Sequence, residues 1–468
     1  MNREKEFVKN SAILSIGTIL PKLTSIITLP IITGCLTQSE YGTYDIITIL
    51  VSLFLPIATV QMQAAAFRYL VGVRDDLHEQ KVVISNITLF TVPVCIGALL
   101  ILYFLLGSIT PITRLLIVIY FFIDTILITL RQIARGLAKN AVYSTSAVIN
   151  SILEMGLMAI TLSVLKLGLN GAVMSLLISQ FVSAAFVFIR INLLKYIDCK
   201  LFSIDEIKKL IAYSWPMIPN SLSSWVMRVS DRLILSWFMG VEANAIYAVA
   251  NKLPNMFNIV QNTFSLAWQE NAALTVEDKD SGEYYGKMFD NVYNVFVGIM
   301  ALLIAFTPVL FRILIRGEYE EAYNHMPILY IGVLFATISS YVGGIYIAHM
   351  KSKQIGITTT LAAVSNFLLN IIFVRKIGIY AASLSTTISY FGLALFRMID
   401  VQKIQKIRFN FIRIIGLTLL LVLMSAVCFM RITMLDLINM ATSIIVATYL
   451  NRIIVFSVIK KVKQKIMK

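Results

Sequence analysis

The chain has 468 residues, of which 58% are hydrophobic and only 14% are charged. A soluble protein of this size would carry about 25% charged residues, so the composition excludes a soluble enzyme or binding module. In a soluble chain the net charge of +15 would suggest a nucleic-acid partner. Here the bias of Lys and Arg toward cytoplasmic loops explains the charge, and we expect no nucleic acid. The composition indicates an all-α polytopic membrane protein.

Fourteen segments are long and apolar enough to cross a membrane, because a span needs about 20 mostly apolar residues. The first is too long for a signal-peptide core and has no small-x-small cleavage site, so we expect it to stay as a helix. The predicted spans are 11–34, 43–66, 82–106, 112–136, 141–165, 169–192, 211–238, 243–269, 287–312, 326–349, 355–374, 377–400, 409–430 and 432–458.

Lys and Arg fall unevenly on the two sides of this topology. With the N-terminus inside, 29 lie in inner segments and seven in outer ones. This bias predicts that both termini are cytoplasmic. Between the sixth and seventh spans, Ser203-Ile204-Asp205-Glu206 has the spacing of a capping box. It predicts a short helix on the inner surface, with Ile207, Leu210 and Ile211 facing lipid.

The two halves of the chain share a weak pattern. A helix with prolines and Lys22 precedes a helix that opens with Gly42-Thr43-Tyr44. A second proline-containing helix, with Arg228, precedes one that opens with Ala245-Ile246-Tyr247. This predicts two six-helix lobes around a central cavity, followed by two further helices. The expected divisions are 1–200 for the N-terminal lobe, 201–404 for the C-terminal lobe, and 405–468 for the last helices and a basic cytoplasmic tail.

Four cations lie at membrane depth, namely Lys22, Arg228, Arg232 and Lys252. A charge there costs roughly 2.5–3.5 kcal/mol on insertion scales, so a chain that keeps four of them is expected to use them. Arg228 and Arg232 are four residues apart and lie on one side of their helix together with Asp231. Alternatively, Asp231 serves only to neutralise an arginine within the bundle.

Two more carboxylates are deep, Asp124 and Glu154, each at the centre of its predicted span. Either could pair with Lys22 across helices, or could bear a coupling proton or cation. Polar side chains also line the seventh and eighth predicted spans. They are Asn220, Ser221, Asn251, Asn255, Asn258 and Asn262.

Several cations beside many amides suit an anionic ligand that also has hydroxyl groups. Guanidinium binds phosphate oxygens as a fork and ammonium binds them as a point charge. A pyrophosphate head group would offset the cations, a lipid tail would stay in the bilayer, and sugar hydroxyls would meet the amides. The residues therefore predict a transported glycan linked to a lipid diphosphate.

Ordered motifs along most of the chain identify a family. They are Glu40-Tyr41-Gly42-Thr43-Tyr44, Arg131-Gln132-Ile133-Ala134-Arg135-Gly136, Tyr213-Ser214-Trp215-Pro216-Met217-Ile218-Pro219, Ser230-Asp231-Arg232-Leu233-Ile234-Leu235, Ala245-Ile246-Tyr247 with Lys252-Leu253, and Phe264-Ser265-Leu266-Ala267-Trp268. With them the chain resembles the Wzx-type, polysaccharide-transport branch of the multidrug/oligosaccharidyl-lipid/polysaccharide (MOP) exporter superfamily.

The resemblance implies a MATE-like fold and a flippase of the bacterial cytoplasmic membrane. Such a flippase moves undecaprenyl-diphosphate-linked oligosaccharide units from the inner to the outer leaflet by alternating access, for capsule or O-antigen-type polysaccharide. It also implies that Lys22, Arg228, Arg232 and Lys252 line the cavity. We expect a monomer among membrane lipids that works with polysaccharide polymerase machinery, without a cofactor or metal.

Two transporter alternatives remain open. A MATE-like multidrug or cation antiporter would use the carboxylates Asp124 and Glu154, and a lipid II-type flippase would fit the count of fourteen helices. An enzyme is not expected, because no extramembrane loop is long enough to fold as a catalytic domain.

Overall fold

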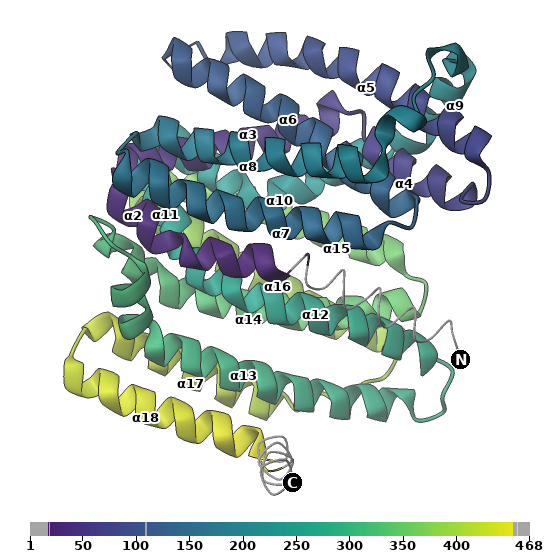
Figure 1. The fold of residues 1–468 in the computed structure, drawn as a ribbon. Coiled ribbons are helices and arrows are strands. Elements are labelled where there is room, and N and C mark those ends of the chain that lie inside the picture. The colour runs from purple at the N-terminus through teal and green to yellow at the C-terminus, as the bar shows by residue number, and fades with distance from the viewer. Residues whose placement is uncertain (1–16, 18, 108–109, 453–455, 457–468) are drawn as a thin grey trace, which may run out of the picture. The chain divides into compact units, whose positions relative to one another are not determined.

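The structure is a computed structural model that describes residues 17, 19–107, 110–452 and 456 (Figure 1). Across these residues the regular secondary structure is entirely helical, which confirms the predicted all-α class. Eleven of the described helices are long and apolar enough to cross a membrane. The other predicted spans correspond to the shorter apolar helix Ile19–Cys35 and to α10 and the α11–α12 pair, which are richer in polar residues.

The chain divides into two compact units, Met1–Ser230 and Asp231–Lys468, and the division falls within α10. The expected divisions at residues 200 and 404, and the expected central cavity, stay predictions. The elements of the first unit are α2 (Leu29–Cys35), α3 (Gln38–Ala58), α4 (Met62–Gly72), α5 (Leu77–Leu105), α6 (Pro111–Gly136), α7 (Asn140–Met158), the π-helix η1 (Ala159–Val164), α8 (Gly168–Ile191), α9 (Ile204–Ser214) and the start of α10 (Met217–Met239).

The second unit is built around α14, which packs against α12 and α16, while α13 packs against α17 and α18. Its elements after α10 are α11 (Val241–Ala250), α12 (Lys252–Leu274), α13 (Ser281–Leu314), α14 (Glu320–Ala348), α15 (Ser352–Ile377), α16 (Ile379–Asp400), α17 (Phe411–Met430) and α18 (Thr433–Leu450).

Two predicted spans are each divided into two helices. The segment predicted at 43–66 breaks between α3 and α4, where Val60 and Gln61 adopt positive φ angles of 47° and 56°. The segment predicted at 243–269 breaks at Asn251, between α11 and α12. Pro254 explains the second break, because it has no N–H to donate to the carbonyl of Ala250.

The short helix predicted after Ser203 is present as α9. The Ser203 hydroxyl accepts a hydrogen bond from Glu206 N at 3.5 Å and caps the helix. The predicted lipid-facing residues are wrong, however. Ile207 and Leu210 are only 8% and 0% exposed, and they belong to the apolar core of the first unit together with Ile211. The helix is held by this packing on α4 and α5 rather than by lipid.

The two units contain a repeated segment that the sequence analysis missed. Residues 166–181 read KLGLNGAVMSLLISQF and residues 376–391 read KIGIYAASLSTTISYF. In both copies a glycine with positive φ lies where the helix begins. Gly168, with a φ of 54°, is at the start of α8, and Gly378, with a φ of 60°, is at the start of α16. The turns before α7 and α15 also match, because Ala138 and Met350 have φ angles of 60° and 58°. The helices α6, α7 and α8 therefore have counterparts in α14, α15 and α16.

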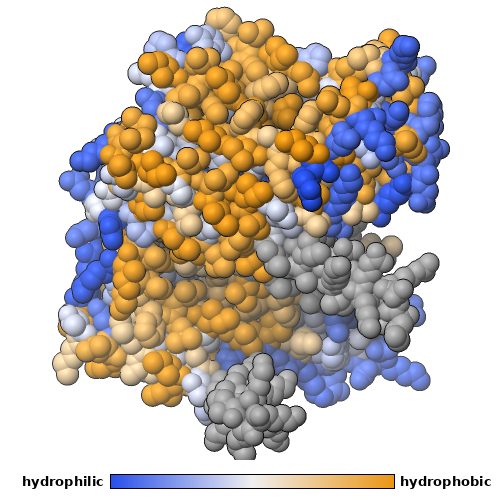
Figure 2. Space-filling view, in the orientation of Figure 1, coloured by the Kyte–Doolittle hydropathy of each residue, from blue (hydrophilic) through white to orange (hydrophobic). Residues whose placement is uncertain are grey.

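The surface agrees with a membrane location. Figure 2 shows hydrophobic residues over much of the visible face and hydrophilic residues gathered near the ends of the helices. Large apolar side chains are exposed along the helices, such as Phe104 at 78% and Ile412 at 88%. Exposure of this kind is stable in lipid and would be unfavourable in water. The protein is a multi-pass membrane protein.

Candidate functional site

The four predicted cations lie on three helices and differ in their exposure. Lys22 lies on the apolar helix Ile19–Cys35 and its side chain is exposed. Arg232 on α10 and Lys252 at the start of α12 are half-buried. The side chain of Arg228, like that of Asn220, lies outside the described residues. Arg232 and Lys252 belong to the second unit and Lys22 to the first.

The predicted amide stripe on α12 is a polar face. Asn255 and Asn262 are exposed, and Asn258 Nδ2 donates to Asn255 Oδ1 at 2.8 Å. Asn251 is turned toward its own helix, since its Nδ2 donates to the carbonyl of Tyr247 at 2.9 Å. The remaining member, Ser221, accepts a hydrogen bond from Gln61 Nε2 at 2.8 Å within the first unit.

Asp231 is the centre of a buried polar cluster in the second unit. Its Oδ2 accepts hydrogen bonds from Thr386 Oγ1 at 2.7 Å and from Tyr247 Oη at 3.0 Å. Its Oδ1 accepts one from Asn370 Nδ2 at 3.1 Å. These donors come from α16, α11 and α15, so the Asp231 cluster (Asp231, Tyr247, Asn370 and Thr386) joins four helices of one unit.

The Asp231 cluster has the ligand chemistry of a site for a small hard cation or a proton. Asn370 is fully buried, and its Oδ1 has no hydrogen-bond donor among the described residues. A buried carbonyl oxygen without a partner costs about 1–3 kcal/mol, so its position beside a carboxylate needs an explanation. Carboxylate, amide and hydroxyl oxygens are the ligands that hard cations take.

Asp124 and Glu154 form a second carboxylate cluster, in the first unit. Gln180 Nε2 donates to Asp124 Oδ1 at 2.9 Å. Both carboxylates lie close enough to the hydroxyl of Tyr120 to interact with it electrostatically, and Glu154 interacts with Tyr44 as well. Acidic groups from α6 and α7 therefore lie within electrostatic range of the same tyrosine, Tyr120. Asp124 also interacts with Arg131 on its own helix.

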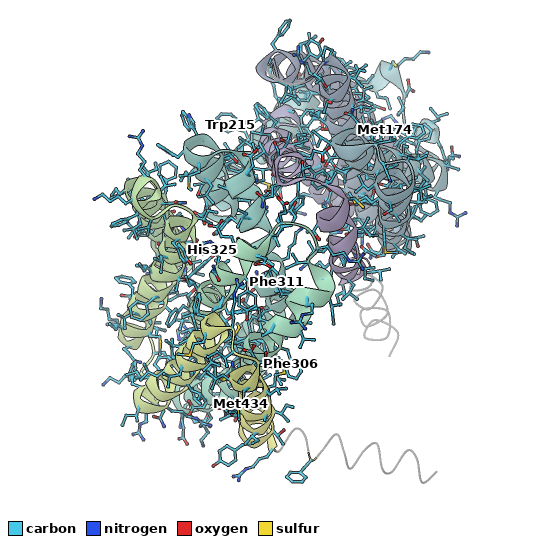
Figure 3. The ribbon with its side chains drawn as sticks, turned by 90° about the vertical axis from the view of Figure 1, so that its left-hand side faces the viewer. Met174, Trp215, Phe306, Phe311, His325 and Met434 are labelled. Carbon is cyan, nitrogen blue, oxygen red and sulfur yellow. The ribbon has the colours of Figure 1, made fainter. Side chains whose placement is uncertain are left out.

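Arg397 lies in the last turn of α16 and is only 4% exposed. Its Nη1 donates to the carbonyl of Ser339 at 2.9 Å, and its Nε and Nη2 donate to Thr358 Oγ1 at 3.0 and 2.9 Å. Nη2 also donates to Thr359 Oγ1 at 2.7 Å. The guanidinium thus binds α14 and α15 to α16. His325 of α14 (Figure 3) is another buried group, with Nδ1 3.1 Å from Ser383 Oγ.

Sequence reasoning found the carboxylates but missed most of their partners. Gln180 and Thr386 lie in the two copies of the repeated segment, which comparison of the two halves would have found. Tyr44 and Tyr247 belong to motifs already singled out, and each contributes to the carboxylate cluster of its own unit. Asn370 was also missed, although Asn366 lies four residues before it on α15 and Asn366 Nδ2 donates to Thr386 Oγ1 at 3.0 Å.

Two curated relatives show similarity along the chain. A putative O-antigen transporter of Shigella flexneri is 24% identical over 398 residues, which are 81% of this chain and 94% of that protein. An uncharacterised membrane protein of Methanocaldococcus jannaschii is 24% identical over 217 residues. The matched region spans 45% of this chain and 42% of the archaeal protein.

Solved structures confirm the predicted MATE-like fold. The lipid II flippase MurJ in an inward closed conformation matches with a TM-score of 0.71, 16% identity, and coverage of 95% of this chain and 99% of that one. An inward-facing multidrug resistance transporter of the MATE family matches with a TM-score of 0.58, 14% identity, and coverage of 82% and 98%. At these identities the likeness concerns the fold.

A family model described as polysaccharide biosynthesis protein matches residues 7–268. The match covers more than half of the chain and includes the positions of Lys22, Arg228, Arg232 and Lys252. It agrees with the family predicted from the ordered motifs, the Wzx-type polysaccharide transporters of the MOP superfamily. The chain belongs to the polysaccharide biosynthesis protein family.

Proposed function

We propose that the protein flips an oligosaccharide linked to undecaprenyl diphosphate from the inner to the outer leaflet of the cytoplasmic membrane. The family match and the putative O-antigen transporter among the relatives support a surface polysaccharide as the product. In this proposal the diphosphate travels along the cations and the lipid tail remains in the bilayer.

The observation on which the proposal rests is an exposed ammonium group on an apolar helix. Lys22 is exposed and follows Pro21 within Ile19–Cys35, a helix whose other exposed side chains include Leu23 and Ile27. An exposed charge at that depth is unfavourable toward lipid. If Lys22 contacts an anionic head group as it crosses the membrane, the charge has a function in transport. That function explains why the chain keeps a charge whose exposure to lipid is unfavourable.

The energy for flipping comes, in this proposal, from a cation or proton gradient sensed by the carboxylate clusters. The Asp231 cluster provides a buried carboxylate and the unpartnered Asn370 Oδ1. Binding of a cation or proton there would neutralise the Asp231 carboxylate, whose hydrogen bonds connect four helices. It would thereby favour one conformation over another. Asp124 and Glu154 are the corresponding candidates in the first unit.

The acidic groups also favour a second candidate, a MATE-like antiporter of organic cations. Such a transporter needs carboxylates that face its ligand. Two oxygens of Asp231 already accept hydrogen bonds from neutral donors, and Asp124 accepts one from Gln180. Because these carboxylates already accept hydrogen bonds, we favour an anionic ligand that binds the cations. In this proposal the carboxylates couple transport to an ion gradient and do not bind the ligand.

The proposal is tested with a bacterial strain that lacks its own polysaccharide flippase. We expect the wild-type chain to restore surface polysaccharide, and Lys22→Ala to lower its level about tenfold or more. The reason is that one charge-assisted phosphate contact contributes about 1.5–3 kcal/mol. Surface polysaccharide and lipid-linked precursor are measured together, and the precursor should accumulate on the inner leaflet.

Lys22→Arg is the matched control, because it keeps a cation that binds phosphate. It should restore most of the activity at the same protein level. Full activity of Lys22→Ala would contradict the anionic route. Resistance to a cationic dye conferred by the wild-type chain, without polysaccharide, would support the antiporter.

A further inference from the structure

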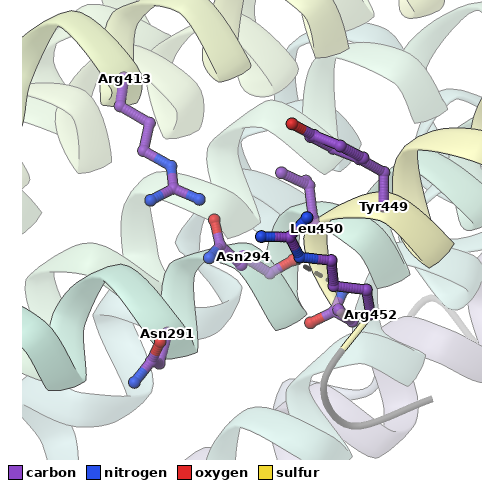
Figure 4. Close-up of a pocket in the computed structure, with 7 residues that line it drawn as sticks. Asn291, Asn294, Arg413, Tyr449, Leu450 and Arg452 are labelled. Atoms are coloured by element: carbon purple, nitrogen blue, oxygen red, sulfur yellow. Dashed lines mark hydrogen bonds between the residues drawn. The ribbon is translucent and has the colours of Figure 1, made fainter. Parts of the chain in front are cut away.

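A polar cavity of about 450 Å³ lies within the second unit, among α13, α17 and α18. It is distant in sequence from the residues assigned to transport. Its lining consists of Asn291, Asn294, Arg413, Tyr449, Leu450, Asn451 and Arg452. Figure 4 shows the side chains of Arg413 and Arg452 extending from different helices toward the space beside Asn294, while Asn291 points away.

The charge of this cavity suits one phosphodiester. Arg413 and Arg452 supply two guanidinium groups. Asp290, one position before the lining residue Asn291, interacts electrostatically with Arg413. Two cations and one carboxylate leave an excess of one positive charge. Guanidinium groups bind phosphate oxygens through paired hydrogen bonds, which an ammonium group does not form.

Asn294 adds an independent sign of a ligand. Its side chain is only 8% exposed, and its Oδ1 has no hydrogen-bond partner among the described residues. The carbonyl of the same residue accepts a hydrogen bond from Asn451 Nδ2 at 3.2 Å, which fixes the end of α18 to α13. A buried acceptor beside two cations calls for a hydroxyl or ammonium donor on the same ligand that carries the phosphate.

The helices that line the cavity also carry exposed apolar side chains. Ile412 precedes Arg413 and is 88% exposed, and Ile445 and Tyr449 on α18 are 67% and 69% exposed. The guanidinium carbon of Arg452 lies 5.9 Å from the centroid of the Tyr449 ring. In a membrane-spanning unit these exposed faces contact acyl chains. The two arginines of the cavity thus lie on or next to helices that also present exposed apolar side chains.

We propose that this cavity binds the head group of an anionic phospholipid that carries a hydroxyl, with its phosphodiester between Arg413 and Arg452 and its hydroxyl on Asn294 Oδ1. The lipid belongs to the leaflet on the side of the chain termini, the inner one in the topology predicted from Lys and Arg. A bound lipid here would fix α17 and α18 to α13, independently of the transported substrate.

The test is native mass spectrometry of the purified full-length chain, titrated with three lipids of identical acyl chains. Phosphatidylglycerol has the phosphodiester and the hydroxyl, phosphatidylmethanol has the phosphodiester without a head-group hydroxyl, and phosphatidylcholine is zwitterionic. We expect phosphatidylglycerol to bind most tightly and phosphatidylcholine least. The Arg413→Gln, Arg452→Gln double variant should weaken phosphatidylglycerol about tenfold or more.

Two controls separate the site from general attraction of anions. Arg375→Gln with Lys376→Gln removes the same charge from the exposed end of α15 and should leave phosphatidylglycerol binding unchanged. Asn294→Ala should reduce the preference for phosphatidylglycerol over phosphatidylmethanol while keeping the preference for anionic lipid. This second variant retains both arginines, so it tests the site even if the double variant does not fold.

Three results would overturn the proposal. Equal losses in the double variant and the Arg375, Lys376 control would show unspecific electrostatics. An unchanged preference for phosphatidylglycerol in Asn294→Ala would remove the role of the hydroxyl. Equal thermal stabilisation of the protein by inorganic phosphate and by phosphatidylglycerol would identify a free-anion site instead of a lipid site.

Discussion

The carboxylate of Asp231 is surrounded by donors from three other helices of its unit. Thr386, Tyr247 and Asn370 donate to it at 2.7, 3.0 and 3.1 Å. Hydrogen bonds of this kind stabilise the ionised carboxylate, whereas burial opposes it. The balance between these effects changes when one more cation or proton arrives. In the proposed function, Asp231 responds to an ion as well as holding four helices together.

We predict that Asp231→Asn uncouples transport from an ion gradient. The amide has nearly the same shape, so the fold should persist, but it cannot be ionised and no longer attracts a cation. The measurement is flipping of a lipid-linked oligosaccharide in proteoliposomes with and without an imposed proton or sodium gradient. The wild-type protein should respond to one of the gradients and the variant to neither.

Thr386→Ser is the matched control for this experiment, because it keeps the hydroxyl that donates to Asp231. It should retain the response to the gradient. A gradient response in Asp231→Asn equal to that of the wild-type protein would mean that the cluster is structural and that coupling lies elsewhere.

At the scale of elements, the turn that leads into α8 depends on Gly168. Gly168 has a φ of 54°, and a Cβ at this position would meet the Glu40 carboxylate. Glu40 Oε2 also accepts hydrogen bonds from Thr37 N at 3.0 Å, as part of the capping box of α3. The start of α8 and the start of α3 thus share one carboxylate. In the second copy, Gly378 has a φ of 60° and faces Met239 instead.

We predict opposite effects for two glycine substitutions in adjacent helices. Gly168→Ala should destabilise the protein by about 1–2 kcal/mol, because it combines an unfavourable φ with a steric contact. Gly156→Ala in α7 should stabilise it by about 0.5–1 kcal/mol, because the site is helical and has no atom within 4 Å of an added Cβ. Thermal unfolding in detergent measures both.

Each substitution serves as the control for the other, because both add the same methyl group. Equal changes in unfolding temperature would contradict the role assigned to the turn. A stable Gly168→Ala variant would indicate that Glu40 moves aside without loss of either helix start.

At the scale of the whole molecule, composition and hydropathy were enough to predict the class and most of the helices, and the ordered motifs predicted the family. Hydropathy measures local apolar length, which determines helices in lipid. It does not predict breaks such as Asn251, or which apolar residues face protein. Ile207 and Leu210 were assigned to lipid for that reason, since burial against α4 and α5 depends on distant residues. The deep carboxylates were predicted, but the helices that provide their donors were not.

We predict that flipping responds to the membrane potential. A negative interior favours outward movement of a diphosphate by about 2.3 kcal/mol per charge for each 100 mV. Proteoliposomes with a potassium gradient and valinomycin should therefore flip the lipid-linked substrate several-fold faster when the side presenting substrate is negative. Equal potassium on both sides provides the control. Identical rates with and without the potential would contradict movement of net charge.

The buried guanidinium of Arg397 has a consequence for how the chain enters the membrane. An arginine opposes insertion of a spanning segment by roughly 2.5–3.5 kcal/mol at the centre of the helix and by less near its end, where Arg397 lies. All of its described acceptors, Ser339, Ile355, Thr358 and Thr359, precede it in the chain. During synthesis, which proceeds from the N-terminus, α14 and α15 are made before α16 emerges. We therefore expect the translocon to deliver α16 to acceptors that are already in place, and insertion of this helix to depend on α14 and α15.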